Sequence, residues 1–317
     1  DKSYVVGFFR NRLGPNELDR ITNIAGLYRD RIFGQAGGDY WKDVFCWPSK
    51  VVEYQGRHGI VAPVYQKHFF FQYGSVNDDA MLNIRGKEKE GKWFASAKNQ
   101  QVFLDERERG DFLKYLQICI KISRAAKRLH AAGLAHSDLS YKNVLIDPFS
   151  GNAAIIDIDS LVVPGKYPPE VIGTPDFIAP EVMKTLHLKV GDPGKHLPSI
   201  RTDCHALAVL IYMYLLRRHP LRGKKVHDLD DTQNDESLAM GEKALFIEHP
   251  TDQSNRPSRK WLGNNYAKLT EWLPWVDVDE LPYSITGKYL EALFKKAFVD
   301  GLHNPQARPS ADEWETA

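Results

Sequence analysis

The sequence predicts an α+β fold in two lobes, with a small strand-rich part ahead of a larger helical part. Short β-branched and aromatic runs crowd the first 66 residues, whereas apolar residues from Asp111 onward mostly follow a helical period. The length of 317 residues suits two lobes that share a cleft. We therefore expect a small lobe over residues 1–66 and a large lobe over residues 67–317, with an extended insertion at about 219–264.

The composition is that of an ordinary soluble globular protein, with 43% hydrophobic and 26% charged residues. A net charge of +1 gives no electrostatic reason to expect nucleic acid or a membrane as partner. Cys46, Cys119 and Cys204 are too few and too scattered for a disulfide framework or a zinc site. The apolar stretch Ala206–Leu216 is shorter than the about 20 residues that cross a bilayer. We also see no signal peptide and expect a cytoplasmic protein.

The small lobe begins with a predicted strand over Ser3–Phe9. A helix follows from Glu17 to about Phe33, with Asn16 as its expected cap and an apolar stripe at helical spacing. The glycine-rich run Gly34–Gly38 ends that helix and is interpreted as a turn.

Beyond this break, the sequence predicts a hairpin and then the large lobe. The hairpin strands are Lys50–Tyr54 and Gly59–Val64, and the charged run Lys87–Arg109 is expected to be a surface connection. Two short strands are expected at Asn143–Ile146 and Ala153–Ile156. The helices predicted for this lobe are Asp111–Gly133, Arg201–Arg217, Ala267–Leu273, Ile285–Phe298 and a last one from Ser310.

Polar residues suited to phosphoryl transfer cluster around the two short strands. Such a transfer needs a hydroxyl held in line and positive charge held against the phosphates. Asp138 can accept the hydrogen bond of the hydroxyl, and Lys142 can neutralise charge on the moving group. Asn143 and Asp157 offer the hard oxygen ligands that Mg²⁺ prefers.

These residues carry a resemblance to the protein kinase superfamily. HSDLSYKN at 136–143 resembles the kinase catalytic loop, and IIDID at 155–159 resembles the strand that ends in Asp-Phe-Gly. Gly173–Glu181 resembles the end of an activation segment with its Ala-Pro-Glu motif. Asp203 and Arg308 match two later family anchors. The resemblance covers Asp111–Trp314 well and the first hundred residues only loosely.

The resemblance implies an ATP- and Mg²⁺-dependent enzyme that phosphorylates serine or threonine of a protein. It implies that Asp138, Lys142 and Asn143 are catalytic, and that Asn143 and Asp157 hold the metal. It implies that Asp203 holds the catalytic loop and that His136 packs in the hydrophobic spine. Further structural roles are implied for the ion pair Glu181–Arg308 and for Thr174, which matches a threonine bonded to the catalytic aspartate.

The resemblance also places the adenine site. Ala62, Pro63, Val64 and Tyr65 would pass the adenine, with backbone groups near Pro63 and Val64 reading its edge, and Leu145 would form the floor. Trp47–Pro48 resembles a narrower group, the bacterial kinase-like proteins of tellurium-resistance and stress operons.

Several positions depart from the family pattern. Ser140 replaces a lysine common in serine/threonine kinases, and Lys142 would take over its place. Ser137 replaces the arginine that clamps a phosphorylated activation loop, so such phosphorylation would not be needed. Asp159 replaces the glycine of Asp-Phe-Gly, which should stiffen the turn.

The small lobe departs furthest, because no Gly-rich loop precedes its first strand. The ATP-binding lysine of the family would fall near Gly7, where Arg10 is the nearest downstream cation, and Glu17 is the candidate helix glutamate. Two explanations stay open. Either the given sequence is part of a longer chain whose Gly-rich loop lies upstream, or the small lobe has diverged and uses another cation.

Alternative functions therefore stay open at this point. The first is a pseudokinase that grips nucleotide or a partner without efficient transfer. The second is a small-molecule kinase or an enzyme that transfers AMP. The acidic run at 228–236 is interpreted as a solvated loop, with docking of a partner or a basic substrate as a further option.

Overall fold

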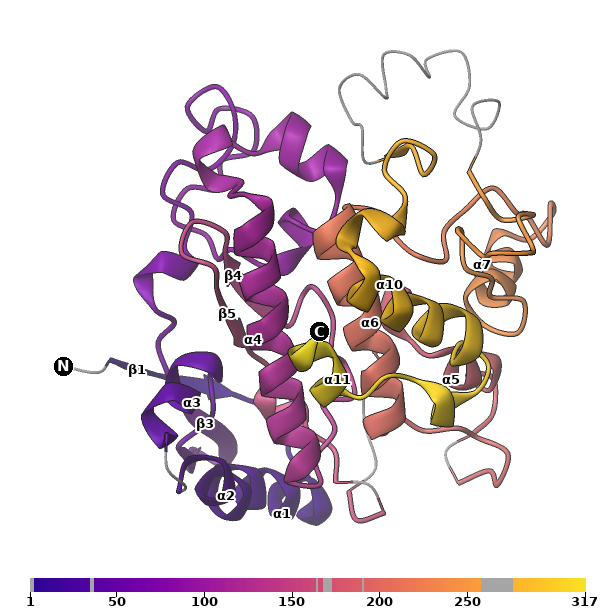
Figure 1. Ribbon diagram of the computed structural model, residues 1–317. Coiled ribbons are helices and arrows are strands. Elements are labelled where there is room, and N and C mark those ends of the chain that lie inside the picture. Colours follow the sequence, from indigo (N-terminus) through magenta and orange to yellow (C-terminus); the bar gives the residue numbers. More distant parts are fainter. Residues whose placement is uncertain (1–2, 35–36, 164, 168–172, 190, 258–275) are drawn as a thin grey trace.

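The computed structural model describes residues 3–34, 37–163, 165–167, 173–189, 191–257 and 276–317. It has the predicted α+β fold in two lobes: the strands and helices of the first 63 residues lie on one side of the long helix α4 (Phe112–Ala131), and the second long helix, α6 (Ile200–Leu216), packs on its other side (Figure 1). Within the described ranges, no helix is long and apolar enough to cross a membrane.

The sheet of the small lobe has three antiparallel strands in the order β1-β3-β2. They are β1 (Tyr4–Phe8), β2 (Lys50–Tyr54) and β3 (Arg57–Pro63), with Tyr4 opposite Pro63. The β1 strand forms an edge, and all five of its residues are exposed. The domain boundary at residue 66 stays a prediction.

The predicted helix of the small lobe is present but differs in its start and interior. It runs as α1 (Pro15–Asn23), a π-helical turn (Ile24–Tyr28) and α2 (Arg29–Phe33). Its cap is Gly14 and not Asn16, because the Glu17 carboxylate accepts a hydrogen bond from the Gly14 amide. The glycine run ends this helix as predicted, with Gly34 at the end of α2, and a separate helix, α3 (Gly38–Val44), begins after the run and buries Val44.

The segment predicted as a surface connection, Lys87–Arg109, is partly buried. Phe94 is fully buried, and Lys89 lies inside with ion pairs to Glu108 at 3.0 Å and to Asp147 at 3.1 Å. The prediction was wrong because the charges that suggested solvent exposure are paired internally, which lets a charged segment pack.

The large lobe is built around two helices that pack against each other. Asp111 caps α4 by accepting from the Lys114 amide at 3.0 Å, and nearly every residue of α6 is buried. The other elements are β4 (Val144–Asp147) and β5 (Asn152–Ile155), which form an antiparallel hairpin, and the helices α5 (Pro180–Lys184), α7 (Thr232–Met240), α10 (Lys288–Lys295) and α11 (Ala311–Thr316). The helix predicted at 267–273 lies outside the described residues.

The insertion contains a helix that the sequence did not predict. Asp231 caps α7 by accepting from the Gln233 and Asn234 amides, and Asp228 and Asp235 accept from backbone amides of the preceding turns. The acidic residues thus form turns and a helix cap, where an open solvated loop was expected. Residues 258–264 of the predicted insertion lie outside the described part of the chain.

Candidate active site

A single carboxylate at the start of α6 holds the loop that carries Asp138. Asp203 accepts from the amides of His136 at 2.6 Å and Ser137 at 3.1 Å, and it contacts His130 Nε2 at 3.2 Å. Ser137 has a φ of 67°, a left-handed conformation that is unfavourable outside glycine. The predicted role of Asp203 is confirmed: it stabilises a strained turn immediately before Asp138.

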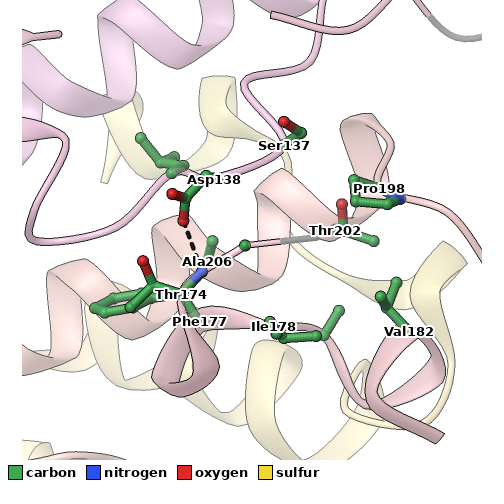
Figure 2. A pocket seen from close by; sticks show the side chains of 12 residues that line it. Ser137, Asp138, Thr174, Phe177, Ile178, Val182, Pro198, Thr202 and Ala206 are labelled. Carbon is green, nitrogen blue, oxygen red and sulfur yellow. Dashed lines mark hydrogen bonds between the residues drawn. The ribbon is translucent and has the colours of Figure 1, made fainter. Parts of the chain in front are cut away.

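Both oxygens of the Asp138 carboxylate are held by neighbouring groups. One accepts from the Thr174 amide at 2.7 Å, the bond drawn in Figure 2, and the other accepts from Asn143 Nδ2 at 3.0 Å. The Thr174 hydroxyl donates to Ser140 Oγ at 3.2 Å, so Thr174 reaches the aspartate through its backbone and not through its hydroxyl. The arrangement fixes the carboxylate while each oxygen keeps a further lone pair.

The amide of Asn143 is oriented by the same contacts. Its Nδ2 also donates to the Asp138 backbone oxygen at 2.9 Å. Its Oδ1 accepts a hydrogen bond from no donor among the described residues. The next strand lies alongside, because the Ile156 amide donates to the Asn143 carbonyl at 3.0 Å. Asn143 and Asp157 therefore lie at adjacent strand ends.

Asp157 is exposed and has a φ of 60°. Its carboxylate accepts no hydrogen bond from any described residue, whereas the carbonyl just before it, on Ile156, contacts His136 Nε2 at 2.9 Å. An unengaged carboxylate beside an unengaged amide oxygen is a donor set that fits Mg²⁺. Burial, and then the charge of Asp157, raises the pKa of Asp159.

Lys142, the last of the predicted catalytic residues, is exposed. No described side chain pairs with its ammonium group, although it is adjacent in sequence to Asn143. The structure thus brings Asp138 and Asn143 into direct contact and leaves Lys142 pointing to no described partner.

The predicted adenine-binding groups are engaged within the protein. Ala62 and Pro63 are the last residues of β3; the Pro63 carbonyl accepts from Cys46 Sγ at 3.4 Å, and the Val64 amide donates to the Ser3 carbonyl at 3.1 Å. Leu145 is 0% exposed and packs with Phe69. The expected floor is therefore covered, and reading of adenine by Pro63 and Val64 stays a prediction.

Tyr65, the last residue of the segment expected to pass the adenine, is partly buried. Burial raises its pKa to about 12, with the nearby Cys46 and the carboxylates Glu88, Asp157 and Asp159 adding to the shift. Its side chain thus lies close enough to Asp157 to respond to that charge.

One cation of the small lobe, Arg20, contacts the turn that carries Asp157, whereas the ATP-binding cation expected near Gly7 stays a prediction. Glu17 is occupied as a cap, and Arg10 is exposed beyond the strand that carries Gly7. Arg20 on α1 is instead buried, and its Nη1 donates to the Asp159 carbonyl at 2.6 Å. The sequence carried one indication that this residue is buried: Arg20 lies four residues before Ile24 and therefore on the apolar face of the helix.

The segment that follows Gly173 is anchored by a buried ion pair and by a second, partly exposed one. Arg308 binds Glu181 in a bidentate pair at 2.8 and 2.7 Å, which confirms the predicted ion pair. Asp176 accepts from the Tyr141 hydroxyl at 2.9 Å and from Arg222 Nε at 2.8 Å. These last contacts, which the sequence did not predict, join the insertion to the catalytic loop.

A cavity of only about 10 Å³ lies beside Asp138, between α6 and the segment that follows Gly173 (Figure 2). Ile178, Val182 and Ala206 line it together with Asp138. That volume is about enough for a single water molecule. It is therefore not a nucleotide pocket.

The comparisons with known proteins agree with this geometry. A model described as "Protein kinase domain" matches residues 73–313. The serine/threonine-protein kinase PknD of Chlamydia felis is 31% identical over 135 residues, 35% of this chain and 13% of that protein. The serine/threonine-protein kinase oca2 of Schizosaccharomyces pombe is 30% identical over 173 residues, 46% of this chain and 25% of that protein.

A solved structure, the kinase PK-1 of the Cydia pomonella granulovirus, is similar with a TM-score of 0.49 and 13% identity, and the match covers 99% of this chain and 84% of that one. The chain spans about an eighth to a quarter of the length of the two curated relatives. The matched model begins at residue 73, after the three-stranded sheet. The narrower resemblance to tellurium-resistance proteins stays a prediction.

Proposed function

The chain belongs to the protein kinase family, and we propose that it transfers the γ-phosphoryl group of ATP to serine or threonine hydroxyls of a protein. The observation that carries the proposal is the contact between Asp138 and Asn143, next to the unengaged carboxylate of Asp157. The names of the curated relatives support the serine/threonine class.

In this proposal Asp138 accepts the hydrogen bond of the acceptor hydroxyl and orients it for attack. The Thr174 amide and Asn143 Nδ2 keep the carboxylate from rotating away. Asn143 Oδ1 and the Asp157 carboxylate would hold Mg²⁺, which supplies positive charge against the phosphate oxygens when bound. Lys142, exposed beside them, adds a further positive charge near the transferred group.

A pseudokinase is the second candidate, and one observation favours it. The Val64 amide and the Pro63 carbonyl are bonded inside the protein, and Leu145 is covered by Phe69. Nucleotide would then have to be read at other backbone groups. The amide and carbonyl of Tyr65 form no hydrogen bond with any described residue, so they are the nearest groups able to do so.

The test is transfer of label from γ-labelled ATP to the protein itself or to a generic basic protein. Asp138→Asn should lower the rate by at least about 100-fold, the usual contribution of a positioned base. Asp157→Asn should abolish transfer through loss of the metal ligand. Asp30→Asn, which changes an exposed carboxylate on α2, is the matched control and should transfer like wild type.

Full transfer by Asp138→Asn would show that the role of Asp138 is wrong. Nucleotide binding by wild type without any transfer would favour the pseudokinase. The free cysteines Cys46, Cys119 and Cys204 are typical of a reducing compartment, and a cytoplasmic location is part of the proposal.

A further inference from the structure

Arg20 links the helix of the small lobe to the turn that carries Asp157. Its side chain is 7% exposed, and Nη1 donates to the carbonyl oxygens of Asp159 at 2.6 Å and Leu161 at 3.4 Å. Burying a guanidinium is costly unless its donors are satisfied, so these contacts are a built feature of the interface. They join α1 to a segment more than 130 residues away in the chain.

The turn itself begins at Asp157. Asp157 has a left-handed φ of 60°, and Ile158–Ser160 form a single 3₁₀ turn. The turn is closed locally by the Ser160 amide and hydroxyl, which donate to the Asp157 carbonyl at 3.2 and 2.8 Å. A left-handed aspartate is about 1 kcal/mol less favourable than a right-handed one, so the conformation depends on surrounding contacts.

The contacts on the far side of the turn come from Arg20 and from the buried side chain of Ile158. The side chain of Ile158 packs in the apolar core, and such contacts do not fix the orientation of the backbone groups around it. Arg20 fixes the orientation of two carbonyl groups, because its planar donors have a rigid geometry. Arg20 therefore helps to fix the turn that begins at Asp157.

We propose that Arg20 is a positioning residue for Mg²⁺ binding: through the carbonyls of Asp159 and Leu161 it holds Asp157 beside Asn143. The inference rests on the proposed function, since it assigns Asp157 to the metal. In this proposal Arg20 touches neither nucleotide nor metal and acts on the metal site through this turn.

A second contact between the same helix and the same segment provides a matched control. The Tyr167 hydroxyl donates to the Asp19 carboxylate and accepts from Asn23 Nδ2 at 3.0 Å. It ties a later part of the segment to α1, ten residues beyond Asp157. Tyr167→Phe removes this anchor and leaves both Arg20 contacts in place.

The experiment measures how Mg²⁺ concentration controls binding of a fluorescent ATP analogue, together with KM and kcat. Arg20→Lys keeps the charge but loses the planar guanidinium that places Nη1 against both carbonyls. The Mg²⁺ concentration for half-saturation should rise at least about tenfold, as for other residues that orient metal ligands. Affinity without Mg²⁺ should stay within about twofold, since no nucleotide contact is lost. Tyr167→Phe should match wild type in both measurements.

Arg20→Gln, which keeps a donor without charge, is measured alongside, and circular dichroism checks that each variant is folded. A folded Arg20 variant with the wild-type Mg²⁺ dependence would overturn the role of Arg20 alone. Equal weakening with and without Mg²⁺ would also overturn it, because that pattern reports a general structural defect. If the wild-type protein bound the ATP analogue equally well with and without Mg²⁺, both this inference and the proposed metal ligands would be overturned.

Discussion

Arg308 is a buried charge that holds together the segments packed next to the candidate site. Its side chain is 1% exposed, and beyond the Glu181 carboxylate its donors reach the carbonyls of Gly301, Arg201 and Leu302. A guanidinium satisfied in this way stabilises the fold only as long as every partner is present. The helices α5 and α6 are thereby tied to the segment just before α11.

Glu181→Gln should therefore be strongly destabilising, because it leaves the buried Arg308 without its carboxylate. We expect the free energy of unfolding to fall by about 3 kcal/mol, measured by urea denaturation. Asp279→Asn breaks an ion pair with Arg256 in which the aspartate is 70% exposed, and it should cost under about 1 kcal/mol. Equal losses in the two variants would contradict the assigned roles.

His219 predicts a pH dependence of stability. Burial lowers its pKa to about 4, and its Nδ1 accepts from the Leu221 amide while Nε2 contacts the Asp176 carbonyl, as suits a neutral ring. In the unfolded chain the pKa is about 6.5. The unfolded state therefore binds more protons between these values, and stability is lost as the pH falls from about 6.5 to about 4.

The measurement is urea denaturation of wild type and His219→Gln at several pH values. Wild type should lose up to about 1.4 kcal/mol per pH unit more than the variant across this window. His205, also buried with a lowered pKa, contributes in the same direction in both proteins. Parallel pH profiles would show that His219 is not responsible.

At the scale of elements, local pattern predicted most of the secondary structure. The helices α4 and α6 and the hairpin β4–β5 could be predicted because periodicity and turn residues agree there with tertiary packing. The helix caps and the short helices could not be predicted in this way. Glu17 displaces Asn16 as the capping group, and α7 depends on Asp231 within a run that looked like an open loop.

The segment at 87–109 is the clearest element-scale failure, and Lys89 tests the explanation. Lys89→Met leaves Glu108 and Asp147 buried without their cation, so the free energy of unfolding should fall by about 3 kcal/mol or more. Lys92→Met removes a lysine that is 40% exposed, and its effect should be under about 1 kcal/mol. Thermal and urea unfolding of both variants provide the comparison. A stable Lys89→Met would contradict the burial seen here.

At the scale of the whole molecule, the large lobe and its polar residues could be predicted together. The catalytic loop, the Asp157 turn, Glu181 and Arg308 follow one another in a fixed order, so their spacing carries the information. The small lobe lacks such a pattern, and its sheet has an exposed edge strand, β1. The role proposed for Arg20 depends on a contact between distant segments, so its place on the apolar face of a helix does not reveal its partner.

The central claim is that the γ-phosphoryl group of ATP reaches a hydroxyl with the help of Asp138. The most direct test incubates the chain and a protein acceptor with ATP labelled either on the γ-phosphate or on the α-phosphate, with Asp138→Asn in parallel. We predict label from the γ-phosphate only, on serine or threonine, and its loss in the variant. Label from the α-phosphate, or undiminished γ-label with Asp138→Asn, would contradict the account.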